Sequence, residues 1–397
     1  MIPEHAVFLS GDAVVSLVES VMERLEGAGG GATPVLVESL RRSLGSAEMV
    51  PVPLLIDLAL GTLRAERLGK RERGWLFTER MAEQCTHPVI ASHHAQAFIG
   101  CNHVLEICTG AGIDTAALSR TVPYVTTLES DSTIVEVTRG NLRRSEIRNV
   151  TVVASAWPVE ALTDLEAFDG VWADPSRRTE RGRKRSGTDY QPPLASIPHA
   201  NVVGIKVGPG DSIEPSGFVS EYIGFGKECR ERVLWKSEHM TVHTVSLIDK
   251  KVSWSRSSEV SPLIVPTAAY LIEPHNAIIA SGDVGTFFAE IGAGVFDAMI
   301  AYGALNEEPP ASPWYKRYKV AKIDQGVSVR RIQESIRELG WGSTTIFKKR
   351  GWENDPEDLR RALSFASGGP PGVVIVMRVG NGHQTVYATS VASRESL

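Results

Sequence analysis

One segment constrains the fold of this chain more than any other: an apolar run that leads directly into a glycine-rich turn and then a helix. It covers residues 104–115 and reads VLEICTGAGIDT. An apolar run of this length bounded by a turn predicts a buried strand. Gly110 and Gly112 lack a Cβ, so the backbone there can pass close beneath a ligand. The segment therefore predicts a strand–turn–helix unit built around a ligand.

The spacing of the glycines distinguishes this turn from two known types of phosphate-binding turn. A dinucleotide turn of the form GxGxxG needs a third glycine, which is absent, and no GK[ST] follows, so it is not a Walker A loop. Glu106 lies inside the strand end and completes the pattern ExxxGxG. This pattern resembles motif I of the class I S-adenosylmethionine (SAM)-dependent methyltransferases. A tight strand–helix turn in another doubly wound protein is the alternative.

Strand and helix patterns alternate beyond residue 100, which predicts right-handed βαβ units and a parallel sheet. Strands are expected at 103–108, 124–129, 150–154, 170–173 and 202–207, and helices at 114–120, 132–145 and 159–165. Ligands bind at the carboxyl ends of the strands in such sheets. The predicted fold class is α/β, a Rossmann-like sheet with an N-terminal helical region and a small C-terminal α+β domain.

Four segments are predicted along the chain. They are an N-terminal helical region at 1–95, the α/β domain at 96–250, a linking segment at 251–312 and an α+β domain at 313–392. Helices are expected at about 34–45, 53–68 and 74–85 in the first segment and a helical run at 284–304 in the third. The stretches 232–235 and 242–248 are expected to be antiparallel closing strands. The acidic, proline-rich stretch 306–313 marks the last boundary.

Composition excludes several classes of protein. The 397 residues carry a net charge of −5, so the chain is not a uniformly basic nucleic-acid coat, although a local basic patch is allowed. Four cysteines without a CxxC pair exclude a disulfide scaffold, and scattered histidines predict no metal site. No run of 18 apolar residues occurs, and the N-terminus does not read as a secretory signal. We therefore expect a soluble, cytoplasmic protein without a membrane partner.

A second acid supports a nucleoside-binding site. Glu129 ends the second expected strand, 23 positions after Glu106, where an acid accepts hydrogen bonds from both ribose hydroxyls. Ser130 follows it, and a helix N-cap is the alternative role at this position. The third strand ends without an acid, so Ser155 is the polar residue expected near an adenine. In the glycine turn, Cys108 is expected to pack beneath the cofactor.

The fourth expected strand leads into Asp174-Pro175-Ser176-Arg177-Arg178, which matches motif IV, where the methyl acceptor meets the sulfonium. A carboxylate there can take up a proton or orient a donor amine, so Asp174 is the first catalytic candidate, with the Pro175 backbone and Arg177 beside it. Asp174 is also expected to border the cofactor. A uracil-C5 enzyme needs a nucleophilic cysteine as well. Cys229 is the only candidate outside motif I and the segment that leads into it, and its context GKECRERV does not match those enzymes.

Basic residues crowd the stretch after motif IV. Arg177, Arg178 and Arg181 belong to a run that also contains 183–185. A solvated loop is one interpretation, and capture of substrate phosphates by arginine forks is the other. Tyr190 follows the run and could stack on a substrate.

Together these segments resemble a bacterial family of class I methyltransferases with a ferredoxin-like insert and a THUMP-like C-terminal domain. The residues that carry the resemblance are 83–88 (EQCTHP), 106–115 (EICTGAGIDT), 174–178 (DPSRR), 349–351 (KRG) and 355–360 (DPEDLR). They are similar to the family patterns EQAT, DLCCGIGIDT, DPARR and RG…DPEELR. Glu106, Thr109 and Ser176 depart mildly from those patterns. Residues 86–94 are also similar to a segment of the trimethylguanosine synthases.

The resemblance covers about residues 75–390 and implies SAM as the cofactor, bound by Glu106, Cys108, Thr109, Gly110, Gly112, Asp114, Glu129, Ser130, Ser155 and Asp174. It suggests transfer of a methyl group to a nitrogen of an RNA base in tRNA or rRNA, with Arg177, Arg178, Arg181 and Tyr190 on the substrate side. Two alternatives stay open. One is a methyltransferase acting on a protein or a small molecule, and the other is a non-catalytic RNA-binding protein with a methyltransferase fold.

Overall fold

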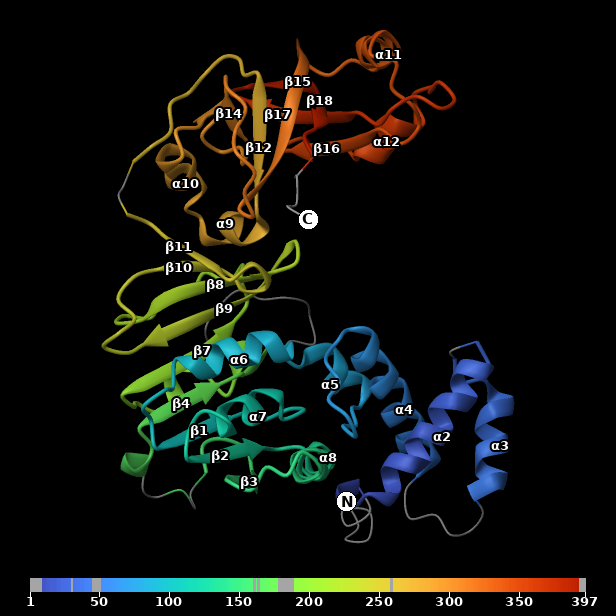
Figure 1. Ribbon diagram of the computed structural model, residues 1–397, viewed down its shortest axis with the longest axis vertical. Helices are drawn as coiled ribbons and strands as arrows, with labels where there is room; N and C mark the ends of the chain where they lie inside the picture. Colours follow the sequence, from blue (N-terminus) through green and yellow to red (C-terminus); the bar gives the residue numbers. More distant parts are fainter. Residues whose placement is uncertain are drawn as a thin grey trace. The chain divides into compact units, whose positions relative to one another are not determined.

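The computed structural model describes residues 9–29, 31–44, 51–159, 162, 165–177, 189–257 and 260–392. The chain forms two compact units (Figure 1). Unit 1 contains residues 1–220 and 233–241, and unit 2 contains residues 221–232 and 242–397. The chain therefore crosses between the units three times, at 220–221, 232–233 and 241–242.

A parallel sheet forms the centre of unit 1. Its strand order is β3-β2-β1-β4-β7, and all four neighbouring pairs are parallel. The strands are β1 (His103–Ile107), β2 (Tyr124–Glu129), β3 (Val150–Ala154), β4 (Gly170–Ala173) and β7 (Val202–Val207). The end of β9 (Glu228–Lys236) that belongs to unit 1 lies next to β7. The α/β fold class expected from the alternating pattern is confirmed.

Three helices lie against this sheet: α6 (Pro88–Gln96), α7 (Ile113–Ser119) and α8 (Ser132–Arg144). α7 and α8 confirm the helices expected at 114–120 and 132–145, whereas α6 was not expected. Most of the helix expected at 159–165 lies outside the described residues. α7 contacts β2 and α6, and α8 contacts β2 and β3 (Figure 1). α8 begins at Asp131, whose carboxylate accepts the backbone N–H groups of Thr133 and Ile134 at 2.9 and 3.3 Å.

Successive side chains of a strand point to opposite sides of the sheet, so its two buried faces carry different residues. One face carries an apolar cluster made of Leu105, Ile107, Leu128, Phe168, Val171, Ala173, Tyr190, Ile197, Val203, Ile205, Val207 and Leu234. The other face carries Glu106, which lies opposite Thr127 of β2 and Trp172 of β4. Gly204 lies opposite Trp172 on β7, so Lys206, two residues on, shares the face of Glu106.

The N-terminal helices are α2 (Ala13–Gly27), α3 (Pro34–Leu44), α4 (Val52–Arg67) and α5 (Glu79–Gln84). The helix expected at 74–85 is wrong in its first half. There the chain forms neither helix nor strand and is buried: the Leu76 N–H donates to Asn141 Oδ1 at 2.9 Å, and the Phe77 N–H donates to Thr62 Oγ1 at 3.1 Å. These tertiary hydrogen bonds replace the helical ones.

Unit 2 contains a seven-stranded sheet in the order β13-β14-β12-β15-β18-β17-β16. Its strands are β12 (Tyr270–Pro274), β13 (Gly294–Val295), β14 (Gly303–Leu305), β15 (Tyr315–Gln325), β16 (Ile346–Arg350), β17 (Val373–Val379) and β18 (Gly382–Ser390). Because β12 pairs directly with β15, strands from the 251–312 and 313–392 segments share one sheet. The helices are α9 (Asn276–Ser281), α10 (Val284–Glu290), α11 (Val329–Glu338) and α12 (Pro356–Arg361).

Two expectations for the middle of the chain need correction. The helical run expected at 284–304 ends after α10, because Gly292 adopts a left-handed φ of 71° and the chain then forms β13 and β14. The stretch expected as an antiparallel strand at 242–248 becomes β10 (Thr244–Leu247). It pairs in parallel with β8 (Val219–Phe225) and antiparallel only with β11 (Val252–Ser255).

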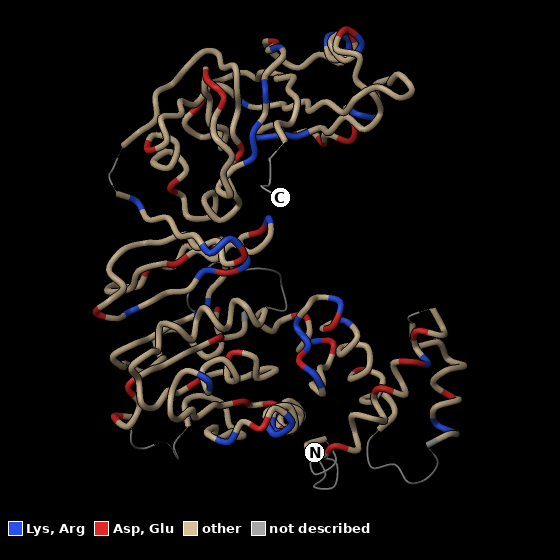
Figure 2. Tube along the Cα trace, in the orientation of Figure 1, with Lys and Arg blue, Asp and Glu red and all other residues tan. Residues whose placement is uncertain are grey.

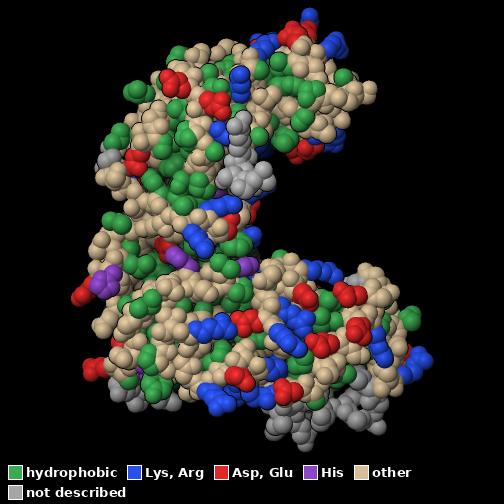
Figure 3. All heavy atoms as spheres, viewed as in Figure 1, with side chains coloured by type: hydrophobic (Ala, Val, Ile, Leu, Met, Phe, Trp, Pro, Cys, Tyr) green, Lys and Arg blue, Asp and Glu red, His purple; other side chains and the backbone are tan. Residues whose placement is uncertain are grey.

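Acidic and basic residues are mixed along unit 1, in the chain trace and on the surface visible in Figure 3 (Figures 2 and 3). This distribution fits the small net charge of the chain. Within the described parts of the chain, no helix has the length and apolar character needed to cross a membrane.

Candidate functional site at the carboxyl edge of the parallel sheet

The glycine turn after β1 is held open by its backbone conformation. Gly110 and Gly112 have left-handed φ values of 55° and 85°, and Cys108 before them has a φ of 72°. The N–H groups of Cys108 and Thr109 both donate to the carbonyl of Leu128 in β2. A Cβ built on Gly110 would meet no atom within 4 Å, whereas one on Gly112 would lie 2.8 Å from Thr138 Cγ2. Gly112 is thus required for packing, and Gly110 faces open space.

Glu129 closes the other side of this turn. Its carboxylate accepts the Gly110 N–H at 3.1 Å and the Asp131 N–H at 2.9 Å, and the Ser130 hydroxyl donates to it at 3.4 Å. Asp131 caps α8, so the alternative N-cap role does not fall to Glu129. The expected juxtaposition of the glycine turn and the acid at the end of β2 is therefore present.

Glu106 is buried beneath the first turns of α7. The Thr115 hydroxyl donates to its carboxylate at 2.5 Å, and 1% of the residue is exposed. Burial raises the pKa of Glu106 to about 8. The hydrogen bonds from Thr115 and Thr127 oppose this rise, and the negative charges of Asp114 and Asp174 add to it. Glu106 is therefore mostly protonated at neutral pH.

Asp174 lies at the end of β4, next to the glycine turn. Its N–H donates to the Ile107 carbonyl of β1 at 3.1 Å, which places motif IV beside motif I. Its carboxylate forms an ion pair with Lys206 of β7, whose side chain is 14% exposed. Lys206 also donates to the Thr86 hydroxyl at 3.1 Å. The candidate catalytic carboxylate is thus held by an ammonium group.

This contact belongs to a larger polar group, which we call the carboxyl-edge cluster: Thr86, His94, Asp114, Asp174 and Lys206. His94 Nδ1 lies 3.0 Å from an Asp114 carboxylate oxygen, and the His94 ring packs on Trp172 at 4.4 Å between centroids. Burial would raise the pKa of Asp114. The hydrogen bond and charge of His94, the charge of Lys206 and the Thr86 hydroxyl outweigh it, so the pKa is lowered.

Sequence reasoning missed three members of this cluster: Thr86, His94 and Lys206. His94 is one of several scattered histidines in the sequence, and Thr86 occurs only as one letter of the motif EQCTHP, so neither stands out as a site residue. A signal for Lys206 was available, because it is the single charged residue of the apolar strand VVGIKV. A lysine inside a buried strand needs a counter-charge, which the strand's neighbours at the carboxyl edge supply.

Other expected cofactor residues lie at the same edge. The Thr109 hydroxyl contacts the Thr127 hydroxyl, which ties the turn to β2. Ser155 follows β3, where Ala154 pairs with Glu129, and its hydroxyl donates to the Ala156 carbonyl at 3.2 Å. Ser130 lies beside Glu129. The structure therefore gathers all of the expected cofactor residues along one edge of the sheet.

The expected substrate residues are placed less uniformly. Pro175 is buried, and Arg177 lies in the short strand β5 (Ser176–Arg177), paired with β6 (Tyr190–Gln191). Arg178 and Arg181 lie outside the described residues. Tyr190 corrects an expectation: it is 4% exposed within the apolar cluster, and its hydroxyl contacts Asp211 and accepts the Gly208 N–H at 2.9 Å. Its ring is not displayed for stacking on a substrate.

The cysteines are unsuited to nucleophilic chemistry. Burial raises the pKa of Cys108 to about 12, and the charges of Asp174, Glu129 and Glu106 contribute to the rise. Burial likewise raises the pKa of Cys229 to about 12, helped by Glu231 and Glu228. Both thiols are protonated at neutral pH, which disfavours the uracil-C5 alternative.

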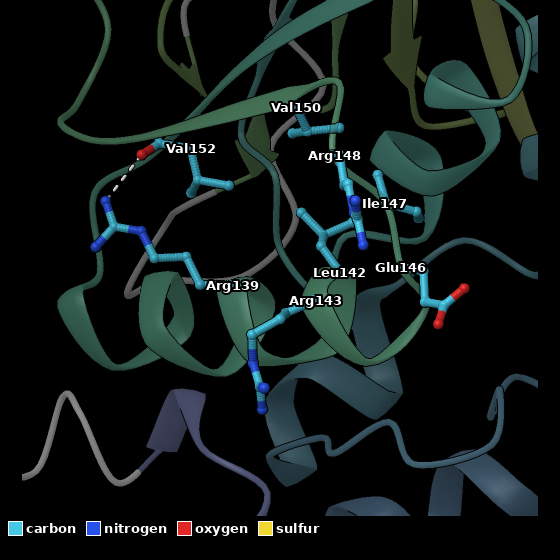
Figure 4. A pocket seen from close by; sticks show the side chains of 8 residues that line it. All are labelled: Arg139, Leu142, Arg143, Glu146, Ile147, Arg148, Val150 and Val152. Atoms are coloured by element: carbon cyan, nitrogen blue, oxygen red, sulfur yellow. Dashed lines mark hydrogen bonds between the residues drawn. The ribbon is translucent and has the colours of Figure 1, made fainter.

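A separate pocket lies at the opposite end of β3, near its first residue (Figure 4). The C-terminal half of α8 and the start of β3 line it. Two of its three arginines are held by other groups: Arg139 donates to the Val152 carbonyl at 2.8 Å, and Arg143 is paired with Asp12. The pocket is therefore distinct from the carboxyl-edge cluster. Among the residues that the structure describes, no group of three His, Cys, Asp or Glu side chains could hold a metal ion.

The residues at the carboxyl edge fit the nucleoside and amino-acid parts of SAM. Glu129 provides a carboxylate for ribose hydroxyls, and the open space at Gly110 leaves the turn accessible to a ligand. Asp114 and Asp174 add carboxylates for cationic groups, while Glu106 is buried beneath the turn. When bound, SAM would supply an activated methyl group, and these side chains would hold it.

Comparisons with known proteins agree with this fit. The chain is 26% identical over 327 residues to an uncharacterized S-adenosylmethionine-dependent methyltransferase of Mycobacterium tuberculosis, found in strains CDC 1551 / Oshkosh and ATCC 25618 / H37Rv. The alignment covers 79% of this chain and 88% of the relative. No family model matches the chain.

The fold is shared with a candidate methyltransferase from Porphyromonas gingivalis W83. The two structures superpose with a TM-score of 0.72 at 16% identity, over 95% of this chain and 99% of the other. Because nearly all of both chains is covered, the likeness includes unit 2 as well as the parallel sheet. The relatives and the fold support a SAM-dependent methyltransferase with S-adenosylmethionine as its cofactor.

Proposed function

We propose that this protein transfers the methyl group of SAM to a nitrogen of an RNA base. The observation that carries the proposal is the placement of Asp174 beside the glycine turn, with its N–H on the Ile107 carbonyl and its carboxylate on Lys206. SAM's methyl is already activated, so the protein mainly has to position the acceptor in line with it. A carboxylate at this place orients a donor N–H and accepts its proton.

Lys206 shapes how Asp174 can act. An ammonium in contact with a carboxylate stabilises its charged form. Asp174 therefore serves first as a fixed hydrogen-bond acceptor for an amine or ring nitrogen, and it receives a proton only as positive charge develops on that nitrogen. Arg177 and the basic run after it would hold a phosphate of the acceptor. The order of the motifs and the carboxylate of Asp174 support a nitrogen atom as the methyl acceptor. The proposal assigns this nitrogen to an RNA base.

Methyl transfer from radiolabelled SAM into extracts of a strain lacking the gene tests the proposal. Extracts are divided after reaction into RNase-treated and protease-treated halves. Label lost only with RNase is the expected result, and Asp174→Ala should abolish incorporation. Label lost only with protease would assign a protein acceptor instead. Absence of label despite SAM binding in calorimetry would point to a small molecule.

SAM binding itself is measured separately by calorimetry on the purified protein. Binding that survives in Asp174→Ala, together with lost transfer, would place Asp174 on the acceptor side. Failure of the wild-type chain to bind SAM would overturn the methyltransferase assignment.

A further inference from the structure

Unit 2 contains a concentration of positive charge that the methyltransferase site does not use. Lys316, Lys348 and Arg350 lie around the carboxylate of Glu273, and Lys227 lies close enough to Lys316 for their charges to repel. We call these four residues the basic cluster. Lys348 Nζ lies 2.5 Å from one oxygen of Glu273, and an Arg350 guanidinium nitrogen lies 3.2 Å from the other. Lys316 lies directly opposite Glu273 in the β12–β15 pair.

The curvature of the seven-stranded sheet creates this cluster. In the strand order, β16 is separated from β12 by β17, β18 and β15, yet Lys348 and Arg350 of β16 both reach Glu273 of β12. Only a strongly curved sheet brings its edge strand back to β12. The residues on its inner face, including Leu271, Val373 and Ile375, form an apolar core. The three cations that this sheet carries, Lys316, Lys348 and Arg350, therefore lie on the same inner side as a buried apolar core.

Two tyrosines fix the centre of the cluster. The hydroxyl of Tyr318 donates to Glu273 at 2.7 Å, and that of Tyr302 donates to it at 3.4 Å. Lys348 lies over the Tyr318 ring and Arg350 over the Tyr302 ring, at 5.5 and 5.8 Å from the ring centroids. Both rings are buried, with 3% and 1% exposure, so they support the cations and present no surface for base stacking.

The positive charges exceed the negative ones around this point. Glu273 serves both Lys348 and Arg350, while Lys227 and Lys316 make no hydrogen bond or ion pair with any residue that the structure describes. Glu228, beside Lys227 in the chain, is the second acid, and it accepts a hydrogen bond from Asn276. Partial burial, with repulsion from Lys348, Lys227 and Arg350, lowers the pKa of Lys316. A multivalent anion would relieve this repulsion.

We propose that the basic cluster binds backbone phosphates of the RNA acceptor. This inference rests on the proposed function and names where unit 2 contacts that substrate. Figure 2 shows basic residues along β15 and β16, the strands that carry three of the four cations. The exposed Lys227 and Lys316, beside Arg350, can each contact a phosphate of the RNA backbone. The rings of Tyr302 and Tyr318 are buried and cannot stack on bases. The contact is therefore one of charge, independent of base sequence.

Fluorescence anisotropy with labelled total bacterial tRNA, and separately with fragmented ribosomal RNA, tests the proposal on the full-length protein. Lys227→Gln/Lys316→Gln is the informative variant, because neither lysine forms an ion pair with Glu273 and the fold should therefore persist. We expect about tenfold weaker binding, and a slope of log affinity against log salt that is smaller by about 0.7–0.9 for each phosphate that the protein no longer neutralises. Lys319→Gln removes one positive charge from β15 on the opposite face of that strand and should leave both quantities unchanged.

Three results would overturn the inference. The double variant could bind both RNAs as the wild type does, Lys319→Gln could weaken binding equally, or polyglutamate could compete as well as unlabelled RNA. Failure of the proposed function is visible separately. In that case the double substitution would still weaken RNA binding relative to the wild type, while no methyl group entered RNA.

Discussion

The ammonium group of Lys206 in strand β7 contacts the carboxylate of Asp174, which follows the neighbouring strand β4. The two residues lie 32 positions apart in the sequence. Their contact links motif IV to Thr86, and through Asp114 to the first turn of α7. Asp174 is thereby held in one orientation next to the glycine turn.

Replacing Lys206 should reduce methyl transfer more than SAM binding. Lys206→Gln leaves the carboxylates of Asp174 and Asp114 without their ammonium partner, and Asp174 can then rotate away from the acceptor. We expect the rate of transfer to fall about 10- to 100-fold, with SAM affinity within a few-fold of wild type. Arg148→Gln, an exposed substitution with the same charge change, is the matched control for single-turnover kinetics and calorimetry. Equal loss of both quantities would show that Lys206 only supports the fold.

The two glycines of the turn should respond differently to alanine. Gly110→Ala keeps a left-handed φ at a cost of about 1–2 kcal/mol, and its Cβ enters the open space where a cofactor would pass. Gly112→Ala adds a clash with Thr138 to the same backbone strain, so it should lose about 2–4 kcal/mol of stability. Denaturant unfolding and SAM calorimetry on both variants separate the effects. A Gly110→Ala protein with normal SAM affinity would place the cofactor elsewhere.

Stability should fall as the pH rises through the neutral range, because of Glu106. Its folded pKa is about 8, above the ordinary value of 4.5, so between these values the folded state binds a proton that the unfolded state has released. The free energy of unfolding then decreases with rising pH, by at most about 1.4 kcal/mol per pH unit. Glu106→Gln should flatten this dependence between pH 5 and 8 in urea titrations. An unchanged slope would assign it to other groups.

Glu273 should make the free energy of unfolding depend on pH in the opposite direction. The pKa of Glu273 is lowered, since hydrogen bonds from Lys348 and Tyr318 and the charges of Lys348 and Arg350 outweigh burial, so its contribution is present at neutral pH and lost as the pH falls through its folded pKa. Glu273→Gln should cost about 3 kcal/mol, measured by thermal unfolding of the full chain. The same substitution adds positive charge, so RNA should bind more tightly. Weaker binding with intact secondary structure would contradict this expectation.

The sequence alone determined the parallel sheet and the residues along its carboxyl edge. Local signals sufficed there: apolar runs alternate with helical patterns, and Glu106, the glycine turn, Glu129 and Asp174 follow their strands directly. Since every strand of a parallel sheet ends at one edge, short-range order in the chain fixes long-range proximity. The same local signals failed at 74–77 and 291–304, where tertiary hydrogen bonds and a left-handed glycine override helical spacing.

Only the tertiary structure decided which partners those residues take. Lys206 reaches Asp174 because two strands are adjacent and side chains alternate between faces, and Tyr190 is buried because β6 folds its ring into the core. In unit 2, Lys348 meets Glu273 across a curved sheet, 75 positions away along the chain. Such contacts depend on register, curvature and strand order, which are set by the packing of the whole domain and have no signature in a local stretch of sequence.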